Sequence, residues 1–176
     1  MISLSEIALT TRLRLGDKRA FEALVRRHQS AVRRFFLHLT LGNEMLSDDL
    51  AQDTFIKAFR HMEQFSGKSS FQTWIFRIAY NTWYDYHRSL KQTDDLENVH
   101  EQSTLGGDVA LRMDLLQAMQ QLKPIERTCI TLQIIDGQST EEIAKITELN
   151  AGTVRSHISR GKQKLANYLK ENGYER

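Results

Sequence analysis

Cysteine and proline are almost absent from this sequence of 176 residues, which has one of each. The single thiol, Cys129, can form no internal disulfide and cannot supply a thiolate-rich zinc site. No apolar run reaches the roughly 18 residues that would span a bilayer, and the N-terminus has no signal-peptide core. We therefore expect a soluble, cytoplasmic protein with a small buried thiol.

The alternation of polar and apolar residues that marks a β-strand is also missing, whereas apolar residues recur at helical spacing along most of the chain. The expected fold class is all-α, with two small helical domains and a flexible linker. The domains are predicted at residues 1–90 and 109–176, and the aperiodic, acidic linker at 91–108. A linker of that length is near the upper limit for a loop inside one compact domain, which favours two domains.

Charge is distributed unevenly, although the formal net charge is only +2. Basic side chains gather between residues 12 and 34, whereas residues 43–53 and 94–101 carry mostly acids. Separate basic and acidic segments indicate separate surfaces for different partners.

Local signals predict where several helices begin and end. Ser47, followed by Asp48 and Asp49, is a candidate N-cap with acids in the first helical turn. Pro124 suits the first turn of a helix that stops near Gly137. Ser139, with a glutamate three residues later, is a capping box that opens a short helix over 140–147.

A second helix follows after about three residues, and the pair has the spacing of a helix-turn-helix. Asn150 is its expected N-cap, and one narrow stripe is predicted to pack inward: Val154, Ile158, Gly161, Leu165 and Leu169. The opposite face holds side chains that can contact phosphates or base edges in a major groove. These are Arg155, Ser156, Ser159, Arg160 and Gln163, and Thr153 lies in the first turn, where a phosphate could bind.

The segment FSGKSSFQTWIFRIAYNTWYDYHRSL, residues 65–90, predicts a loop and then a long helix. Its core stripe is expected to be Phe71, Trp74, Ile75, Ile78, Ala79 and Thr82. The other face interleaves aromatic and polar side chains: Phe76, Arg77, Tyr80, Asn81, Tyr84 and Arg88. Such a face suits single-stranded nucleic acid, since any base can stack on a ring and cations hold the backbone. The simpler alternative is that these rings contact other helices.

The order of these motifs resembles the extracytoplasmic-function group of bacterial sigma factors, over about residues 15–169. The motifs are DDLAQDTFIKAF, FSGKSSFQTWIFRIAYNTWYDYHR, an acidic linker, LKPIERTCITLQIIDGQSTEEIA and GTVRSHISRGKQKL. The resemblance implies two helical domains, called regions 2 and 4, that give RNA polymerase its promoter specificity. It also implies a membrane-anchored anti-sigma factor that covers these surfaces in response to an extracytoplasmic signal.

The resemblance assigns three sets of residues. Docking on the clamp helices of the largest polymerase subunit falls to Asp48, Asp49, Leu50, Gln52, Asp53, Phe55, Ile56 and Phe59. Opening and reading the −10 element falls to Phe65, Ser66, Lys68, Trp74, Arg77, Tyr80, Asn81, Tyr84 and Arg88. Reading the duplex −35 element falls to Thr153, Arg155, Ser156, Ser159, Arg160, Lys162 and Gln163, with the polymerase flap region as a further partner of the protein.

The sequence departs from the family pattern at two positions. Glu148 stands where the turn of the helix-turn-helix usually carries glycine, and Asn150 stands where many members have proline. We therefore expect either a left-handed conformation at Glu148 or a slightly different turn.

Two other classes of function stay open from the residues alone. An autonomous repressor or activator would use the helix-turn-helix as a dimer on duplex DNA, which leaves the acidic helix and the aromatic face without a role. A metal-dependent nuclease would need Asp49 and Asp53 plus a further ligand, and the sequence supplies neither a nearby third ligand nor an HxxxH pair. We expect a non-enzymatic protein with no cofactor or metal.

Overall fold

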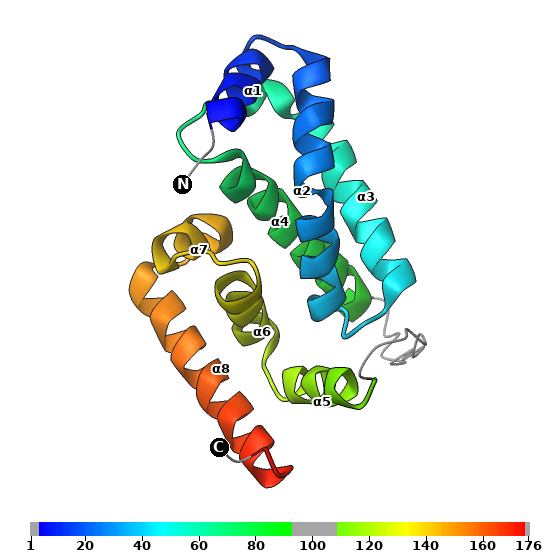
Figure 1. Ribbon diagram of the computed structural model, residues 1–176, viewed down its shortest axis with the longest axis vertical. Helices are drawn as coiled ribbons and strands as arrows, with labels where there is room; N and C mark the ends of the chain where they lie inside the picture. Colours follow the sequence, from blue (N-terminus) through cyan, green and yellow to red (C-terminus); the bar gives the residue numbers. More distant parts are fainter. Residues whose placement is uncertain (1–3, 93–108, 175–176) are drawn as a thin grey trace. The chain divides into compact units, whose positions relative to one another are not determined.

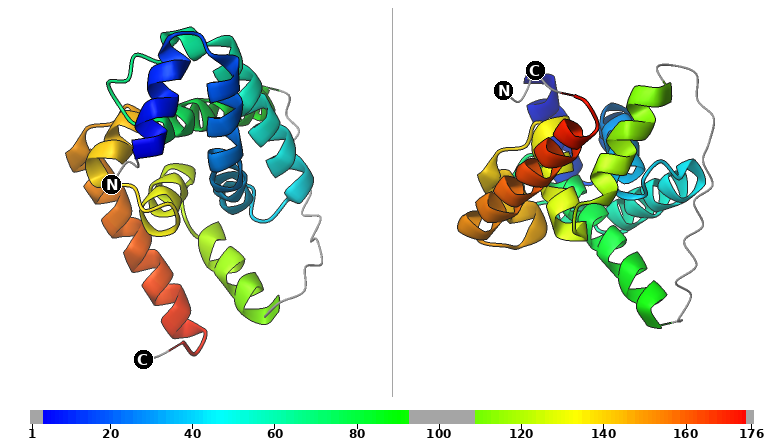
Figure 2. Two further views of the ribbon diagram at one scale, coloured as in Figure 1. Left: turned by 45° about the horizontal axis from the view of Figure 1, so that its top comes forward. Right: turned by 90° about the horizontal axis from the view of Figure 1, so that it is seen from below.

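The computed structural model describes residues 4–92 and 109–174, and these residues fold as helices and connecting loops with no strand among them (Figures 1 and 2). The predicted all-α class is confirmed. The chain divides into two compact units. Unit 1 holds Met1–Phe36 and Asp48–Asn98, and unit 2 holds Leu37–Ser47 and Val99–Arg176. Unit 2 therefore includes a segment that the predicted boundaries assign to the first domain.

Unit 1 is built mainly from four α-helices: α1 (Leu4–Arg14), α2 (Lys18–Leu39), α3 (Glu44–Arg60) and α4 (Phe71–Gln92). A short 3-10 turn, η1 (Met62–Gln64), follows α3. The end of α2 and the start of α3 belong to unit 2. Because α4 continues to Gln92, it extends two residues into the predicted linker, whose remaining residues, 93–108, lie outside the described part of the chain.

Aromatic residues form much of the core of unit 1. Phe35, Phe36, Phe71 and Phe76 are fully buried, and the rings of Phe35 and Phe76 meet edge to face with centroids 5.4 Å apart. Each such side chain stabilises the fold by about 1.5–3 kcal/mol through the apolar area that it removes from water. The long helix α4 thus contributes rings to the interior on more than one face.

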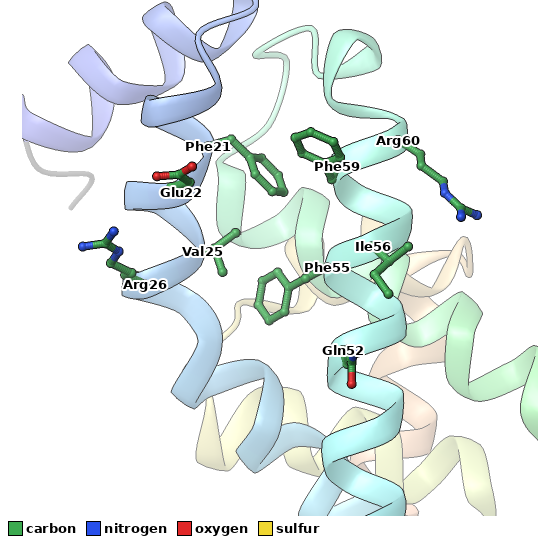
Figure 3. A pocket seen from close by; sticks show the side chains of 9 residues that line it. All are labelled: Phe21, Glu22, Val25, Arg26, Gln52, Phe55, Ile56, Phe59 and Arg60. Atoms are coloured by element: carbon green, nitrogen blue, oxygen red, sulfur yellow. The ribbon is translucent and has the colours of Figure 1, made fainter.

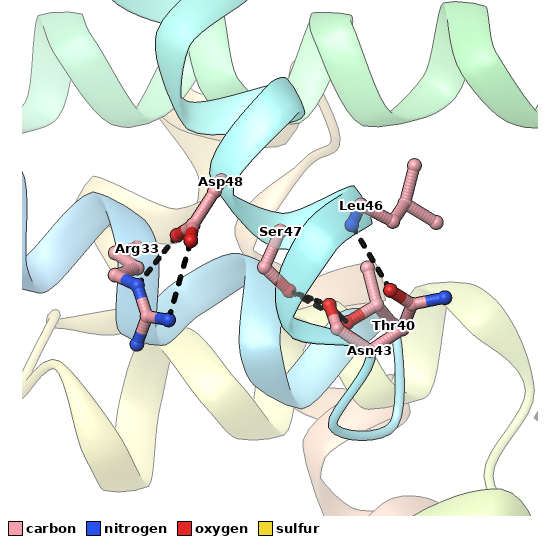
Figure 4. Close-up of polar contacts among 6 residues, drawn as sticks. All are labelled: Arg33, Thr40, Asn43, Leu46, Ser47 and Asp48. Atoms are coloured by element: carbon pink, nitrogen blue, oxygen red, sulfur yellow. Dashed lines mark hydrogen bonds and ion pairs between the residues drawn. The ribbon is translucent and has the colours of Figure 1, made fainter. Parts of the chain in front are cut away.

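The start of α3 differs from the prediction. The helix begins at Glu44, and Asn43 caps it, because the Asn43 Oδ1 accepts the backbone N–H of Leu46 at 3.0 Å (Figure 4). Ser47, the predicted N-cap, is buried in the first turn instead. Its hydroxyl donates to the carbonyl of Asn43 at 2.5 Å and lies 2.8 Å from the hydroxyl of Thr40.

Unit 2 contains α5 (Val109–Gln120), α6 (Pro124–Ile130), α7 (Thr140–Thr147) and α8 (Ala151–Glu171). A π-helical turn, η2 (Thr131–Ile135), continues α6. Pro124 starts α6, and Gly137, with a φ of +67°, stands two residues after the last helical residue, Ile135, so the segment stops near this glycine as the sequence predicts. The predicted helix over 140–147 is present with the same bounds.

Helices α6 and α8 pack closely in unit 2. A Cβ atom at Gly161 of α8 would lie 2.7 Å from the Cγ1 of the buried Ile130 of α6, so only glycine fits this approach without movement. Cys129 beside it is fully buried, and burial raises the pKa of its thiol to about 12. The thiol is therefore protonated and inert, in agreement with the sequence-based expectation.

None of the described helices is both long enough and apolar enough to cross a membrane.

Candidate functional site

The helix-turn-helix predicted near the C-terminus is present in unit 2. Ser139 Oγ accepts the backbone N–H of Glu142 at 3.2 Å, and the Glu142 carboxylate accepts the N–H of Ser139 at 3.0 Å. After α7, Glu148 adopts the left-handed conformation with a φ of +60°. Asn150 Oδ1 then accepts the N–H of Thr153 at 2.7 Å and caps α8. The predicted caps of α7 and α8 are confirmed, and of the two conformations expected at the turn, Glu148 adopts the left-handed one.

The polar face of α8 is exposed as the periodicity predicts. Val154, Ile158 and Gly161 are buried, whereas Leu165 and Leu169 at the C-terminal end are half-buried. The exposed side chains are Arg155, Ser156, Ser159, Arg160, Lys162 and Gln163, and Thr153 is half-buried. This face therefore offers three cations and three neutral hydrogen-bonding groups to a ligand in the groove of a duplex.

A buried carboxylate of α6 lies behind that face. Glu126 accepts a hydrogen bond from Lys164 at 2.7 Å, and its second oxygen lies 3.7 Å from Arg160 Nε. Neither Glu126 nor Lys164 was identified from the sequence as part of the site. The capping box of Ser139 and Glu142 is visible in the sequence, whereas Glu126, two residues after Pro124, follows a lysine that is not a typical capping residue.

On α4 the predicted polar face is present only in part. Arg77, Asn81, Tyr84 and Arg88 are exposed, and Tyr80 is half-buried with its ring 6.3 Å from that of Tyr84.

Phe76 was also predicted on this face, but it is fully buried because it packs against Phe35. Trp83, for which the sequence predicts no role, is buried as well, and its ring meets that of His87 edge to face with centroids 4.2 Å apart. In the predicted core stripe, Phe71, Ile75, Ala79 and Thr82 are buried, whereas Trp74 and Ile78 are half-buried.

The loop before α4 exposes Ser66 and Lys68 but not Phe65. The Phe65 ring is 3% exposed and packs against the rings of Phe71 and Trp74, at 5.9 and 5.4 Å. It therefore supports the loop from within instead of offering a free face to DNA. Ser70 ends the loop and caps α4, since its hydroxyl accepts the N–H of Thr73 at 3.0 Å.

The residues predicted on α3 for polymerase docking divide between surface and core. Asp49, Gln52, Asp53, Ile56 and Phe59 are exposed, and Phe55 is half-buried. Leu50 is 4% exposed, which corrects its assignment to a contact surface. Asp48 is exposed, but Arg33 of α2 holds its carboxylate in an ion pair at 2.5 Å (Figure 4).

An apolar groove of about 460 Å³ runs between α2 and α3 (Figure 3). Four predicted docking residues line it from α3, namely Gln52, Phe55, Ile56 and Phe59, together with Arg60. The opposite wall comes from α2 and was not predicted: Phe21, Glu22, Val25 and Arg26. The Phe21 and Phe59 rings meet across the groove, with centroids 5.5 Å apart. Asp49 and Asp53 are exposed on α3, the helix that forms the first wall of the groove.

Comparison with known proteins assigns the two parts of the chain to one family. Residues 24–93 match the model of Sigma-70 region 2, and residues 112–165 match that of Sigma-70, region 4.

Curated relatives span almost the same length. The chain is 32% identical to an ECF RNA polymerase sigma-E factor of Haemophilus influenzae, with 94% of this chain and 96% of the relative covered. It is 32% identical to the RNA polymerase sigma-H factor of Pseudomonas aeruginosa, with 89% and 90% covered.

Two solved structures are similar. One is CnrH in complex with the cytosolic domain of CnrY, with a TM-score of 0.75 and 26% identity over 96% of this chain and 99% of that chain. The other is the sigma factor RpoE in complex with the anti-sigma factor NepR from Bartonella quintana, with a TM-score of 0.74 and 28% identity over 85% and 96%.

Proposed function

The chain belongs to the extracytoplasmic-function group of the sigma-70 family, and from this we infer that it binds core RNA polymerase and directs it to specific promoters. The observation that carries the inference is the presence of regions 2 and 4 in order on one chain, the second with an exposed basic face on α8. Sigma factors initiate transcription without being enzymes. The catalysis therefore belongs to the polymerase.

We assign residues 1–90 to region 2, 91–108 to a linker and 109–176 to region 4. Each region alone would bind its DNA element weakly. When both are mounted on polymerase, the binding of one raises the effective concentration of the other, and affinity for a promoter that carries both elements increases. Region 4 would hold the duplex −35 element while region 2 holds the melted −10 strand.

Docking on core polymerase is assigned to the exposed side of α3 and the groove beside it. Asp49 and Asp53 supply negative charge that suits a basic partner helix, and Ile56 and Phe59 supply apolar surface. The groove gives an apolar side chain of the clamp helices a place to insert, with α2 as its second wall. Exposed acids around an apolar centre are typical of a specific interface between proteins.

The −10 element is assigned to α4 and the preceding loop. Tyr80 and Tyr84 offer rings on which an unstacked base can lie, and Arg77 and Arg88 offer charge to the backbone. Ser66 and Lys68, which are exposed in the loop before α4, are assigned to the same element. A base captured there must leave the stack, which is the same physical step as base flipping.

The −35 element is assigned to α8. Arg155 and Arg160 can make bidentate contacts with guanine, Gln163 with adenine, and Ser156 and Ser159 can contact several bases as short donors. Lys162 and the first turn at Thr153 suit phosphates.

Regulation is assigned to an anti-sigma factor that covers one or more of these surfaces. One similar structure is that of a sigma factor with its anti-sigma factor, and another holds the cytosolic domain of a second protein. We propose that this protein acts in the cytoplasm and that a membrane-anchored partner releases it after an extracytoplasmic signal.

Transcription in vitro with core polymerase on a genomic library, followed by start-site mapping, tests the function. We expect defined start sites only when both proteins are present.

Arg160→Ala should reduce initiation that depends on the −35 element by about 10-fold, the size of one lost base contact, whereas Asp53→Ala should weaken core binding. Tight, polymerase-independent gel shifts of duplex DNA would instead favour an autonomous regulator. Unchanged core affinity of Asp53→Ala would refute the docking assignment.

A further inference from the structure

A buried carboxylate connects α6 to two cations of α8. Glu126 stands in the first turn of α6, and its side chain is 3% exposed. Its Oε2 accepts hydrogen bonds from Lys164 Nζ at 2.7 Å and from the backbone N–H of Lys123 at 3.1 Å. Its Oε1 lies 3.7 Å from Arg160 Nε. One carboxylate thus faces two cations that are one turn apart on the helix assigned to −35 recognition.

Glu126 is charged at neutral pH despite its burial. Burial is the largest single influence and raises the pKa of this carboxyl, but the hydrogen bonds from Lys164 and Lys123 and the charges of these two lysines together outweigh it, so the pKa lies below its usual range. A buried charge is costly unless cationic and hydrogen-bonding partners stay in place. The ion pairs of Glu126 therefore restrict the conformations that the Lys164 and Arg160 side chains adopt.

Arg160 is restricted from two sides. Its Nη2 lies 3.0 Å from Nδ1 of His157, and because arginine can only donate, this nitrogen accepts and the imidazole is neutral with its proton on Nε2. Burial and the charge of Arg160 lower the pKa of His157, which favours this state. The Arg160 side chain is nevertheless 56% exposed, so the remaining N–H groups of its guanidinium are available to DNA.

We propose that Glu126 is a positioning residue for promoter specificity, which orients the Arg160 guanidinium from inside unit 2 toward one base pair of the −35 element. The inference rests on the proposed function of α8. A bidentate contact with guanine depends on the orientation of the guanidinium plane. A side chain that is already oriented also loses less rotamer freedom on binding than a free one.

Glu126→Gln tests the role of the charge, since glutamine can still accept the N–H of Lys123 and keep the cap of α6. The assay is transcription by full-length protein and core polymerase from templates with a randomised −35 segment. We expect discrimination to fall about 3- to 10-fold, as for a weakened base contact, at the same base pair where Arg160→Ala loses it. Glu126→Gln should cause no further loss in the Arg160→Ala background.

Glu142→Gln is the matched control. Glu142 occupies the equivalent capping position of α7, and the change removes the same charge from unit 2. Its base preferences should equal those of the wild type. An unchanged profile for Glu126→Gln, an equal loss at every base pair, or losses that add to those of Arg160→Ala would each overturn the proposal. A wild-type protein that yields no polymerase-dependent start sites would overturn the proposed function instead.

A measurement on the unaltered protein avoids any folding defect of the variant. Hydrogen exchange of the Arg160 Nε–H, followed by ¹⁵N NMR, should be slower than that of the exposed Arg155, because Nε faces a buried anion. Equal exchange of the two side chains would contradict the proposed contact. Slower exchange in the wild type and recovery of fast exchange in Glu126→Gln would support it.

Discussion

Glu148 carries the left-handed turn of the helix-turn-helix on a residue with a Cβ atom. Its φ of +60° costs a non-glycine residue about 1 kcal/mol relative to glycine. The turn forms nonetheless, because the capped helices α7 and α8 on either side require it. This residue therefore carries a small local strain that the surrounding structure offsets.

Glu148→Gly should relieve that strain. We expect an increase of about 0.5–1 kcal/mol in the free energy of unfolding, which would raise the thermal midpoint by several degrees in a domain of this size. Circular dichroism at increasing temperature measures it. Glu148→Ala is the control, since alanine removes the side chain but keeps the Cβ atom. An equal gain for both variants would contradict the conformational explanation.

His28 is a second residue with a measurable consequence. It is largely buried in α2, its ring lies 5.3 Å from that of Phe71, and Nε2 lies 3.5 Å from the Glu6 carboxylate. Burial lowers its pKa below the ordinary 6.5, although Glu6 opposes the shift. In the unfolded chain the histidine takes up a proton more readily. The stability that the neutral, buried His28 contributes is thus complete above about pH 6.5. It is lost as the pH falls through the pKa that His28 has in the folded protein.

We therefore expect unit 1 to be less stable to urea at about pH 5.5 than at about pH 7.5, because the unfolded chain binds a proton at His28 more readily than the folded one. Fluorescence is a suitable probe, because both tryptophans, Trp74 and Trp83, are in unit 1. His28→Gln, which does not titrate, should reduce the difference between the two pH values. Parallel pH dependence in wild type and variant would assign the effect to other groups.

At the scale of elements, the contact of α6 with α8 determines how the basic face is presented. Gly161 permits the approach to Ile130, and the same helix pair brings Lys164 to Glu126. A tilt of α8 relative to α6 would therefore change the distance between Lys164 and the Glu126 carboxylate as well as the packing of Gly161 against Ile130.

Gly161→Ala tests this helix pair. Overpacking against Ile130 should cost about 1–3 kcal/mol, offset by up to about 1 kcal/mol from the better helix propensity of alanine. In the background of Ile130→Ala, which removes the obstructing Cγ1, the same change should cost less or stabilise. A double-mutant cycle in urea measures the coupling. An equal cost in both backgrounds would show that the close approach is unimportant.

The sequence predicted elements well where the signal was local. The capping box of α7, the Asn150 cap, the start at Pro124 and the stop at Gly137 each depend on a few neighbouring residues. Ser47 failed as a predicted cap because Asn43 competes four residues earlier and the tertiary setting of α3 favours the longer helix. A serine and an asparagine with equal capping propensity cannot be ranked by sequence pattern alone.

At the scale of the whole molecule, initiation requires one surface for polymerase and others for DNA. Phe59, which is 45% exposed at the groove, belongs to the surface for polymerase. A substitution there should therefore reduce initiation at every promoter by the same factor. Residues of α8 should instead change which promoters are used. The proposal therefore predicts two distinguishable defects: a uniform loss of initiation from substitutions at the polymerase surface, and a change in promoter choice from substitutions in α8.

Phe59→Ser should lower affinity for core polymerase about 10-fold or more, as for an exposed aromatic anchor. Initiation at different promoters should fall by the same factor at limiting protein. Met45→Ser is a matched control, because Met45 is 71% exposed on the same helix and does not line the groove. Competition binding to core polymerase and multi-promoter transcription measure both. A selective loss at some promoters would place Phe59 outside the docking surface.

The groove itself could not be predicted from sequence, although four of its residues were. Phe21 and Val25 stand some 30 residues before Phe55 and Phe59, and only the pairing of α2 with α3 makes them opposite walls. Phe76 and Leu50 were assigned to surfaces for the same reason. A helical period identifies the residues that share a face, whereas burial depends on which neighbouring helices cover it.

Cys129 has a practical consequence for following this protein at work. Thiol-reactive dyes attack the thiolate, and the single natural cysteine is buried with a pKa of about 12. A cysteine introduced at an exposed site in each unit can therefore take a fluorophore without prior removal of the native one. Energy transfer between two such fluorophores would then record, molecule by molecule, whether the separation of the units changes as polymerase binds and a promoter opens.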